Sequence, residues 1–198
     1  MAHTIGIIGL GKIALDQHVP AIRADPAFDL LAVSSQRGLQ VDGAKHAVRD
    51  HRELLRLPDL EAVAICTPPQ VRHGIAREAL EAGKHVLLEK LPAATLSELE
   101  DLRRLGERAG RVVFTAWHSQ FNRAVDEAQR ALQGHEVRRL LVTWKEDVRR
   151  WHPGQQWIWQ PGGFGVFDPG VNALSILTKI LPEPIFLRRA ELSFPENR

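Results

Sequence analysis

A short glycine motif near the start of the chain has the spacing that binds phosphate groups. It consists of Gly9, Gly11, Lys12, Ile13 and Ala14, in the pattern G-x-G-x-x-A. The first glycine permits a tight turn, the second lets the backbone approach a pyrophosphate, and the alanine lets a helix pack closely on a strand. The motif follows an apolar run and opens a helical pattern, which is the context that supports it. We expect it to bind a dinucleotide; the alternative is an ordinary strand-to-helix turn.

Cofactor choice should be decided after the second apolar run, at Ser35, Gln36 and Arg37. Sites that prefer NAD usually carry an aspartate or glutamate here, which binds the ribose 2′-hydroxyl. This chain has no carboxylate at that point. Ser35 and Arg37 can instead hold a 2′-phosphate, Arg37 through a charge-assisted hydrogen bond. We therefore expect NADP or NAD as the cofactor, with NADP favoured; the alternative is that Arg37 is simply solvated.

A lysine and a carboxylate further along the chain suit proton transfer. Lys90 follows an apolar strand pattern at 85–89, and ligands of parallel sheets bind at the carboxyl ends of strands. A cation there favours a developing alkoxide. Asp168 and Asn172 are four residues apart, so on a helix they share one face, as a base and a hydroxyl-binding amide would. The alternatives are a solvated Lys90 and an Asp168 that only caps a helix before Pro169.

Composition excludes several other chemistries. The 198 residues contain no tyrosine, so a Tyr-x-x-x-Lys proton relay is impossible, and the single cysteine excludes a disulfide framework or a cysteine-built zinc site. We expect no metal. A net charge of +2, with basic and acidic residues interspersed, indicates no nucleic-acid partner. The first residues do not form a signal peptide and no apolar run is long enough to span a membrane, so we expect a cytoplasmic protein without a membrane partner.

Strand and helix patterns alternate along residues 1–118, as in a doubly wound parallel α/β sheet. Asp50 is expected to cap a helix over 51–57, and Thr95 with Glu98 forms a capping box for a helix that ends near Gly110. Strands are expected at 4–8, 30–34, 61–67, 85–89 and 111–116. These elements predict a Rossmann dinucleotide-binding domain over 1–118.

Residues 119–198 have a different texture. The expected elements are a helix at 122–132, a strand at 137–147, a loop at 149–169, a helix at 171–180 and a strand at 185–194. They predict the first part of a truncated α+β domain with an open, mainly antiparallel sheet. An unpaired sheet edge invites association, so a homo-oligomer formed through this sheet is a further expectation.

Taken together, the motifs resemble the oxidoreductase family of glucose-fructose oxidoreductase and inositol dehydrogenase. The resemblance covers the whole chain. It rests on the glycine motif, Thr67-Pro68, the run A-G-K-H-V-L-L-E-K at 82–90, Gly162-Gly163 and Asp168-Pro169-Gly170. Within the family, the run W-K-E-D-V-R-R-W-H-P-G-Q-Q-W-I-W at 144–159 looks like bacterial L-arabinose and D-galactose 1-dehydrogenases. Those enzymes oxidise the anomeric carbon of an aldose to a lactone, with NAD or NADP as hydride acceptor.

The resemblance implies a role for each matching residue. Catalysis would fall to Lys90, beside sugar and nicotinamide, and to Asp168 as the acid/base residue. The sugar would be bound by Glu146, His152 and Asn172, and the cofactor, besides the residues above, by Thr67, Pro68, Glu89 and Lys90. Trp151 is added as part of a stacking wall for the sugar. From the residues alone, His152 can equally be a loop histidine, and Trp151, Trp157 and Trp159 can be packing residues.

The chain departs from the usual family pattern in three places. Leu91 replaces the proline of E-K-P, and Pro69 and Arg72 stand where asparagine and histidine are usual. The D-x-x-x-H helix carries Asn172 in place of the histidine. Asparagine cannot exchange a proton, so the duty of the missing histidine must fall on another group. The aldose 1-dehydrogenase branch shares that substitution.

Three functions are consistent with these observations. The first is an NAD(P)-dependent aldose 1-dehydrogenase that oxidises L-arabinose or D-galactose. The second is a non-catalytic protein of the same family that senses NAD(P) and docks a partner, and the third is an inactive fragment of the enzyme. Lys90, Asp168 and Asn172 together favour the enzyme, because a sensor need not retain them.

Overall fold

The structure, a computed structural model, describes residues 2–193, which form two compact units. Of these described residues, the first unit comprises 2–117 with 146–168, and the second comprises 118–145 with 169–193. The region expected to begin at residue 119 therefore contributes 146–168 to the first unit. As a result, Lys90 and Asp168 belong to the same unit although 78 positions separate them.

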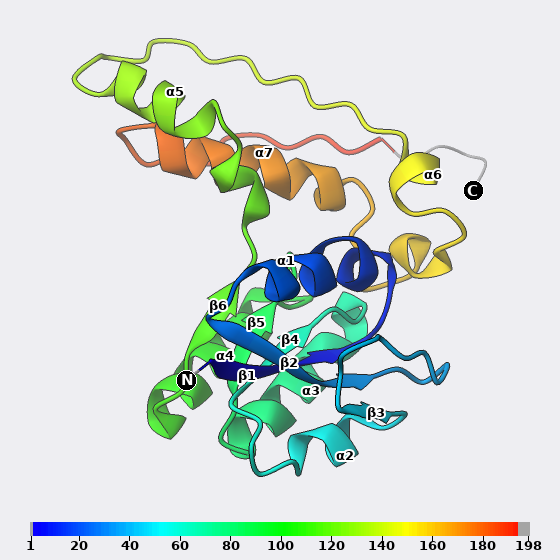
Figure 1. Cartoon of the computed structure of the whole chain (residues 1–198). Coiled ribbons are helices and arrows are strands. Elements are labelled where there is room, and N and C mark those ends of the chain that lie inside the picture. Colours follow the sequence, from blue (N-terminus) through cyan, green and yellow to red (C-terminus); the bar gives the residue numbers. More distant parts are fainter. Residues whose placement is uncertain (1, 194–198) are drawn as a thin grey trace. The chain divides into compact units, whose positions relative to one another are not determined.

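A six-stranded parallel sheet forms the centre of the first unit (Figure 1). Its strands are β1 (His3–Ile8), β2 (Phe28–Ser34), β3 (His46–Val48), β4 (Ala62–Ile65), β5 (His85–Leu88) and β6 (Val113–Thr115). They lie in the order β3-β2-β1-β4-β5-β6, and every neighbouring pair is parallel. The order reverses between β1 and β4, and in such sheets ligands bind outside the carboxyl ends of the strands at this switch point. The predicted Rossmann fold is confirmed.

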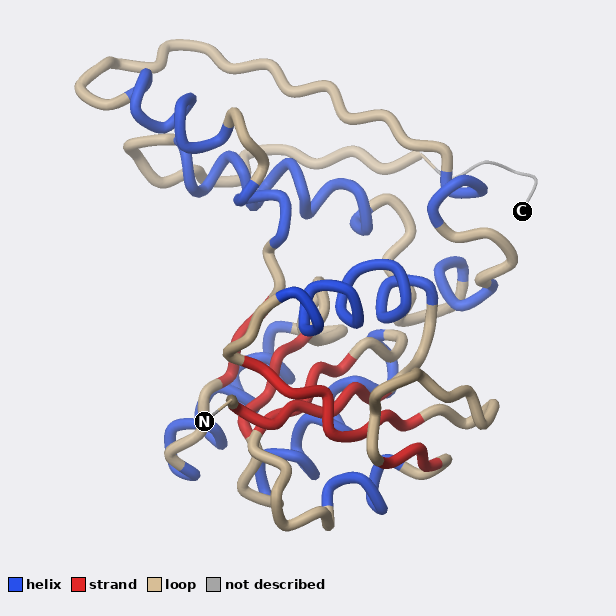
Figure 2. Tube along the Cα trace, in the orientation of Figure 1, coloured by secondary structure: helices blue, strands red, loops and turns tan. Residues whose placement is uncertain are grey.

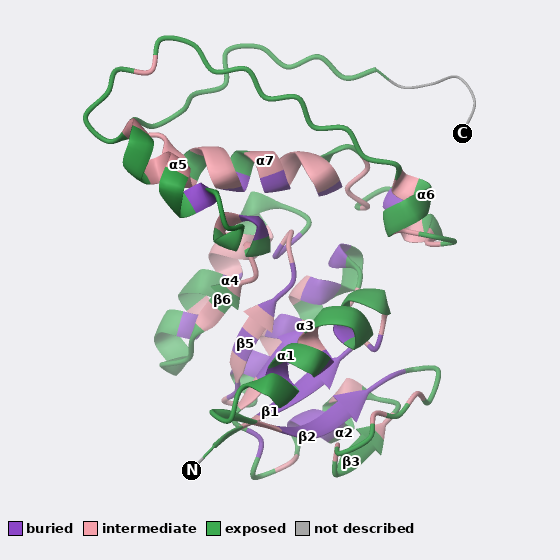
Figure 3. Ribbon diagram, turned by 45° about the horizontal axis from the view of Figure 1, so that its top comes forward, coloured by how far each residue is buried: buried purple, intermediate pink, exposed green. Residues whose placement is uncertain are grey.

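Helices cover both faces of the sheet, which explains why its strands are apolar on both sides. Successive strand residues point to opposite faces. Leu30 accordingly packs in the core beneath α1 (Val19–Ala24), whereas Leu31 packs in the core shared with α2 (His51–Leu55), α3 (Pro69–Glu81) and α4 (Leu96–Ala109). The strands are largely buried and the outer faces of the helices are exposed (Figure 3).

The predicted helix ends are present. The Asp50 side chain accepts a hydrogen bond from the backbone N–H of Arg52 at 2.9 Å and caps α2. Thr95 and Glu98 form the reciprocal capping box of α4. That helix ends at Gly110, whose φ of 62° lies in the left-handed region that glycine adopts without strain.

Two local features differ from the sequence-based expectation. No strand was expected at β3, which has three residues, two of them exposed, and pairs only with β2. A strand this short has no alternation of apolar and polar residues to reveal it. The helix that follows the glycine motif is also irregular, because it passes through a π-helical segment, Ala14–His18, before α1.

The second unit contains a 3₁₀ turn, η2 (His118–Phe121), α5 (Val125–Leu132) and most of α7 (Phe167–Ile180). Lys179 of α7 joins these elements. Its Nζ donates to the carbonyl of Gln120 at 2.8 Å and lies 2.6 Å from Oδ1 of Asp126. The Nε2 of Gln129 donates to the carbonyl of Lys179 at 2.8 Å. Within residues 2–193, no helix is long and apolar enough to cross a membrane.

The strands predicted at 137–147 and 185–194 are not formed in the described residues (Figure 2). Alternating apolar residues favour a strand, but a strand exists only where its backbone bonds to a neighbouring one. Up to residue 193, neither segment pairs with a strand, and residue 194 lies outside the described residues. Leu141 and Phe186 are exposed. The predicted antiparallel sheet is therefore absent from the part of the chain that the structure describes.

Candidate active site

Gly9 ends β1 in a conformation that requires glycine. Its φ is 94°, and an added Cβ would lie 3.1 Å from the backbone nitrogen of Thr67 and 3.2 Å from the carbonyl carbon of Cys66. Its N–H donates to the carbonyl of Ser34 at 2.9 Å. The turn therefore lies against the carboxyl ends of both β2 and β4. A Cβ on Gly11, in contrast, would meet no atom within 4 Å, which leaves the open space that a pyrophosphate needs.

Thr67 gives a second indication that a ligand belongs beside the glycine turn. Its Oγ1 is buried and has no hydrogen-bond partner among residues 2–193. A buried polar group without a partner costs about 1–3 kcal/mol. Because Thr67 touches Gly9, a polar group bound by the glycine motif can satisfy this hydroxyl. The residues present therefore fit a dinucleotide.

The remaining predicted cofactor residues surround this turn. Arg37 is exposed, but its Nη2 donates to the carbonyl of Leu10 at 3.1 Å, so it lies over the glycine motif. Ser35 is buried after β2, and its N–H donates to the carbonyl of Val48 at 3.0 Å. Lys12, Ile13, Gln36 and Pro68 are exposed, whereas Ala14 is buried. Lys12 forms an ion pair with Asp16, and Pro68 directly precedes α3.

Lys90, Asp168 and His152 meet in one cluster. Lys90 lies two residues beyond β5, and the Lys90–Leu91 peptide bond is cis. The Nζ of Lys90 lies 2.6 Å from Oδ1 of Asp168 and donates to its carbonyl at 3.2 Å. The Nε2 of His152, which follows α6 (Val148–Trp151), lies 2.7 Å from Oδ2. The side chains of Lys90, Asp168 and His152 are 14%, 7% and 18% exposed, so the charges interact with little screening.

The contacts within the cluster shift the pKa values of Asp168 and His152. Burial alone would raise the pKa of Asp168, but hydrogen bonds from His152 and Lys90 outweigh it and hold that pKa below its ordinary value. The hydrogen bond to Asp168 raises the pKa of His152, against burial and the charge of Lys90. Asp168 is therefore an ionised carboxylate at neutral pH, with a donor on each oxygen. A carboxylate has about four lone-pair positions, so capacity remains for a ligand hydroxyl.

Gln155 and Trp157 orient His152 from its other side. The indole Nε1 of Trp157 donates to Oε1 of Gln155 at 2.8 Å, and an indole N–H is only a donor, so this Gln155 atom is the amide oxygen. The same oxygen lies 3.3 Å from Nδ1 of His152. Both ring nitrogens of His152 thus face acceptors, which favours the doubly protonated ring. The rings of His152 and Trp157 also meet edge to face, with centroids 5.5 Å apart.

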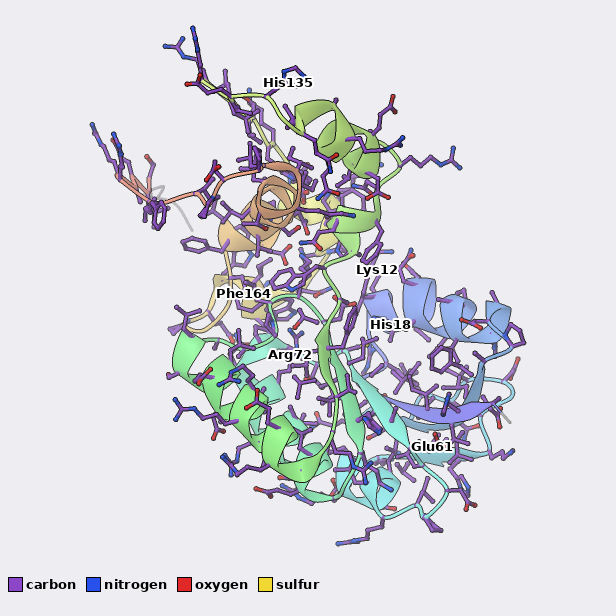
Figure 4. All side chains as sticks on the ribbon, turned by 90° about the vertical axis from the view of Figure 1, so that its left-hand side faces the viewer. Lys12, His18, Glu61, Arg72, His135 and Phe164 are labelled. Carbon is purple, nitrogen blue, oxygen red and sulfur yellow. The ribbon has the colours of Figure 1, made fainter. Side chains whose placement is uncertain are left out.

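A second buried pair joins the glycine-motif helix to the lysine segment. The Nε2 of His18 lies 2.6 Å from Oε1 of Glu89, and both side chains are largely buried. The other oxygen of Glu89 accepts from the backbone N–H of Lys90 at 3.2 Å. Figure 4 labels His18 on that helix. Glu89, expected at the cofactor site, therefore links the helix that follows the glycine motif to Lys90.

The other predicted sugar-binding residues lie outside this cluster. Glu146 is exposed. Trp151 is half exposed, and the guanidinium of Arg150 lies 5.1 Å from its ring centroid. The ring of Trp157 meets that of His152 edge to face, and the sugar-stacking role expected of Trp151 stays a prediction. Asn172 follows Asp168 by one turn of α7 and belongs to the second unit.

Sequence reasoning missed three residues of the site: His18, Gln155 and Trp157 as a ring partner of His152. No local pattern marks His18, because its partner is 71 positions away. Gln155 and Trp157 lie within five positions of His152 in a segment rich in aromatic and amide groups, and that composition was the available signal. A hollow of about 390 Å³ borders the segment and is lined in part by His152, Gln155 and Trp159.

Comparisons with known proteins show the family of the chain. The model of an oxidoreductase family with an NAD-binding Rossmann fold matches residues 3–117. A galactose 1-dehydrogenase from Pseudomonas fluorescens is 47% identical over 193 residues, which are 98% of this chain and 62% of that protein. The crystal structure of a D-galactose-1-dehydrogenase from Rhizobium etli has a TM-score of 0.92 at 48% identity, covering 100% of this chain and 63% of the other.

A more distant structure carries a cofactor. A 3-ketoreductase from Actinomadura kijaniata, in complex with TDP-benzene and NADP, has a TM-score of 0.62 at 26% identity, covering 67% of this chain and 43% of the other. The chain spans less than two thirds of the length of each of these relatives. The glycine turn, the strand order and the family match lead to one conclusion. The chain belongs to the oxidoreductase family with an NAD-binding Rossmann fold that includes glucose-fructose oxidoreductase and inositol dehydrogenase.

Proposed function

We propose that the whole protein is an NAD(P)-dependent aldose 1-dehydrogenase that oxidises the anomeric carbon of D-galactose or L-arabinose to the lactone. The observation that carries the proposal is the buried cluster of Lys90, Asp168 and His152, which lies in the same unit as the glycine motif. The names of the two similar galactose dehydrogenases support D-galactose as substrate. L-arabinose rests on the sequence resemblance.

In this proposal, Asp168 is the base that accepts the proton of the C1 hydroxyl. Its ionised carboxylate has capacity for a further hydrogen bond beside those from Lys90 and His152. A dinucleotide held at the glycine motif would supply the acceptor for the hydride that leaves C1. Loss of one hydride and one proton converts the cyclic hemiacetal into the lactone, and the proton later passes from Asp168 to solvent.

Lys90 and His152 complement Asp168 in different ways. The ammonium of Lys90 stabilises negative charge that develops on the sugar oxygen, which favours loss of the proton. His152 keeps the carboxylate ionised and oriented, because its pKa is raised by the same contact. The missing histidine of the D-x-x-x-H helix is thus replaced in this proposal by His152, contributed from another segment. Glu146 and Asn172 remain candidates for binding the other sugar hydroxyls.

We further propose that NADP is preferred over NAD. No carboxylate follows β2, and Arg37 lies over the glycine motif through its bond to the carbonyl of Leu10. Arg49 and Gly38 line an adjacent hollow of about 190 Å³, so a second arginine is close to the same strand ends. Two guanidinium groups and no carboxylate favour a 2′-phosphate.

The test is cofactor reduction by the whole protein, followed at 340 nm, with a panel of aldoses and with NADP⁺ and NAD⁺. Reduction with D-galactose or L-arabinose, faster with NADP⁺, is the expected result, and lactone formation identifies C1 as the site. Tight cofactor binding without reduction by any aldose would contradict the enzyme and support the cofactor-sensing protein instead. Matched analogues that lack the C1 hydroxyl must be unreactive.

A further inference from the structure

A buried arginine holds the backbone on both sides of Lys90. Arg72 belongs to the first turns of α3 and is only 4% exposed. Arginine is rarely buried to this degree without partners. Figure 4 labels it beside the ends of the strands of the first unit. Arg72 stands where the family usually has a histidine. It is not among the residues proposed to bind the cofactor or to transfer the proton.

The guanidinium donates to three backbone carbonyls. Nη1 donates to the carbonyl of Glu89 at 2.7 Å and also to that of Leu91, and Nη2 donates to that of Thr67. Glu89 and Leu91 are the two neighbours of Lys90, and Thr67 follows β4. The planar guanidinium presents several donors in a fixed arrangement, so it fixes these segments relative to each other. Its Nε has no partner in the described part of the chain.

The charge of Arg72 is retained in this position. Burial lowers the pKa of Arg72 to about 10, while the negative charges of Glu89 and Asp168 oppose the shift. The guanidinium is therefore cationic at neutral pH, and the field of Asp168 reaches it. Removing the group would leave three carbonyls without their donor and would take a positive charge from the surroundings of the cluster.

We propose that Arg72 is a positioning residue that fixes the backbone of Lys90 so that its ammonium meets Asp168. A lysine side chain has many rotamers, and the 2.6 Å contact between Nζ and Oδ1 depends on where its backbone is held. Arg72 bonds on each side of that residue, whereas the Lys90 side chain itself bonds to Asp168. This role rests on the proposed function for its effect on turnover, but its effect on Lys90 does not.

Lys84 offers a matched control. It is also a buried cation, 8% exposed, whose Nζ donates to the carbonyls of Leu57 at 3.1 Å and Leu60 at 2.8 Å. Lys84 precedes β5 and Lys90 follows it, so the two lysines lie at opposite ends of that strand. Lys84→Met removes buried backbone bonds of the same kind and leaves the candidate active site unchanged.

The experiment measures how fast Lys90 is acetylated by a limiting amount of acetic anhydride in the cofactor-free protein, with exposed Lys45 as internal reference and mass spectrometry as readout. Asp168→Asn shows the rate of a Lys90 released from its partner. We expect Arg72→Met and Arg72→Lys to accelerate Lys90 acetylation at least about tenfold, as loss of one charge-assisted bond would. Lys84→Met should leave the Lys90 rate unchanged, even if its melting temperature falls as far.

Arg72→Lys keeps the positive charge but loses the guanidinium geometry, because one ammonium cannot reach all three carbonyls. It also serves as the test variant if Arg72→Met does not fold, since it retains a buried cation. A wild-type Lys90 rate in a folded Arg72→Lys would overturn the proposal, as would an equal acceleration in Lys84→Met. In the whole protein, kcat should fall at least about tenfold in Arg72→Lys. Absence of aldose oxidation by the wild type would contradict the proposed function and leave the acetylation result standing.

Discussion

The Nε2 of His152 lies 2.7 Å from Oδ2 of Asp168, and this contact sets the protonation of both side chains. It raises the pKa of His152 and, with the bond from Lys90, keeps the pKa of Asp168 low. The raised pKa means that His152 stabilises the fold fully below the ordinary imidazole pKa of about 6.5, and that this stabilisation is lost as the pH rises through the folded pKa. Asp168 stabilises the fold fully at pH values above its ordinary pKa, and this stabilisation is lost as the pH falls through its lowered pKa in the folded state.

The first prediction concerns stability against pH. His152→Gln should lower the free energy of unfolding more at about pH 5.5 than at about pH 9, because the protonated ring gains more from Asp168 than the neutral ring does. Denaturant unfolding at both pH values measures the difference. His135, exposed in the second unit and labelled in Figure 4, supplies the control His135→Gln, which removes an imidazole but leaves the contact between His152 and Asp168 in place. A pH-independent loss in His152→Gln would mean that the contact does not favour the imidazolium.

The second prediction concerns the glycine motif. Gly11→Val should keep the fold, since the space around Gly11 is open, but weaken NADP⁺ binding at least about tenfold because the side chain fills the space for the pyrophosphate. Gly9→Ala should instead lower the melting temperature, because Gly9 has a φ of 94° and atoms within 3.2 Å of the new Cβ. Calorimetry and thermal melts measure the two effects. Unchanged NADP⁺ affinity in Gly11→Val would contradict the site.

The third prediction concerns cofactor choice. Arg37→Ala should weaken NADP⁺ binding by about 1–3 kcal/mol, as expected for a charge-assisted contact with the 2′-phosphate, and leave NAD⁺ binding nearly unchanged. Calorimetry with both cofactors measures the difference. The exposed arginine that caps the end of α2 provides the matched control Arg56→Ala, which should affect neither cofactor. Equal losses for the two cofactors in Arg37→Ala would show that Arg37 does not touch the 2′-phosphate.

Local sequence signals predicted much of the first unit. The capping box of Thr95 with Glu98 involves residues three positions apart, so it can be found without knowing the fold. The alternation of strand and helix patterns predicts a parallel sheet covered by helices, although not the short strand β3 or the order of the strands. The segments at 137–147 and 185–194 show the limit, because their apolar pattern favours strands but the described chain provides no strand to pair with them.

The candidate site was predicted residue by residue, but not as an arrangement. Lys90 and Asp168 were identified from motifs, whereas their contact spans 78 positions and depends on how 146–168 packs in the first unit. The bond of His18 to Glu89 and those of Arg72 to three carbonyls are also contacts between distant segments. No local spacing carries such information, which explains why their roles emerged only from the structure.

The most direct measurement of the central claim is turnover of Asp168→Asn in the whole protein. The amide keeps the shape of the side chain but cannot accept a proton at neutral pH, so kcat should fall by about 10²–10⁴ while cofactor and sugar affinities stay within a few-fold. Lys90→Met should also lower kcat, and the double variant should lose less than the sum, because both groups serve one proton transfer. Wild-type turnover in Asp168→Asn would contradict the assignment and leave Asp168 as a structural partner of Lys90 and His152.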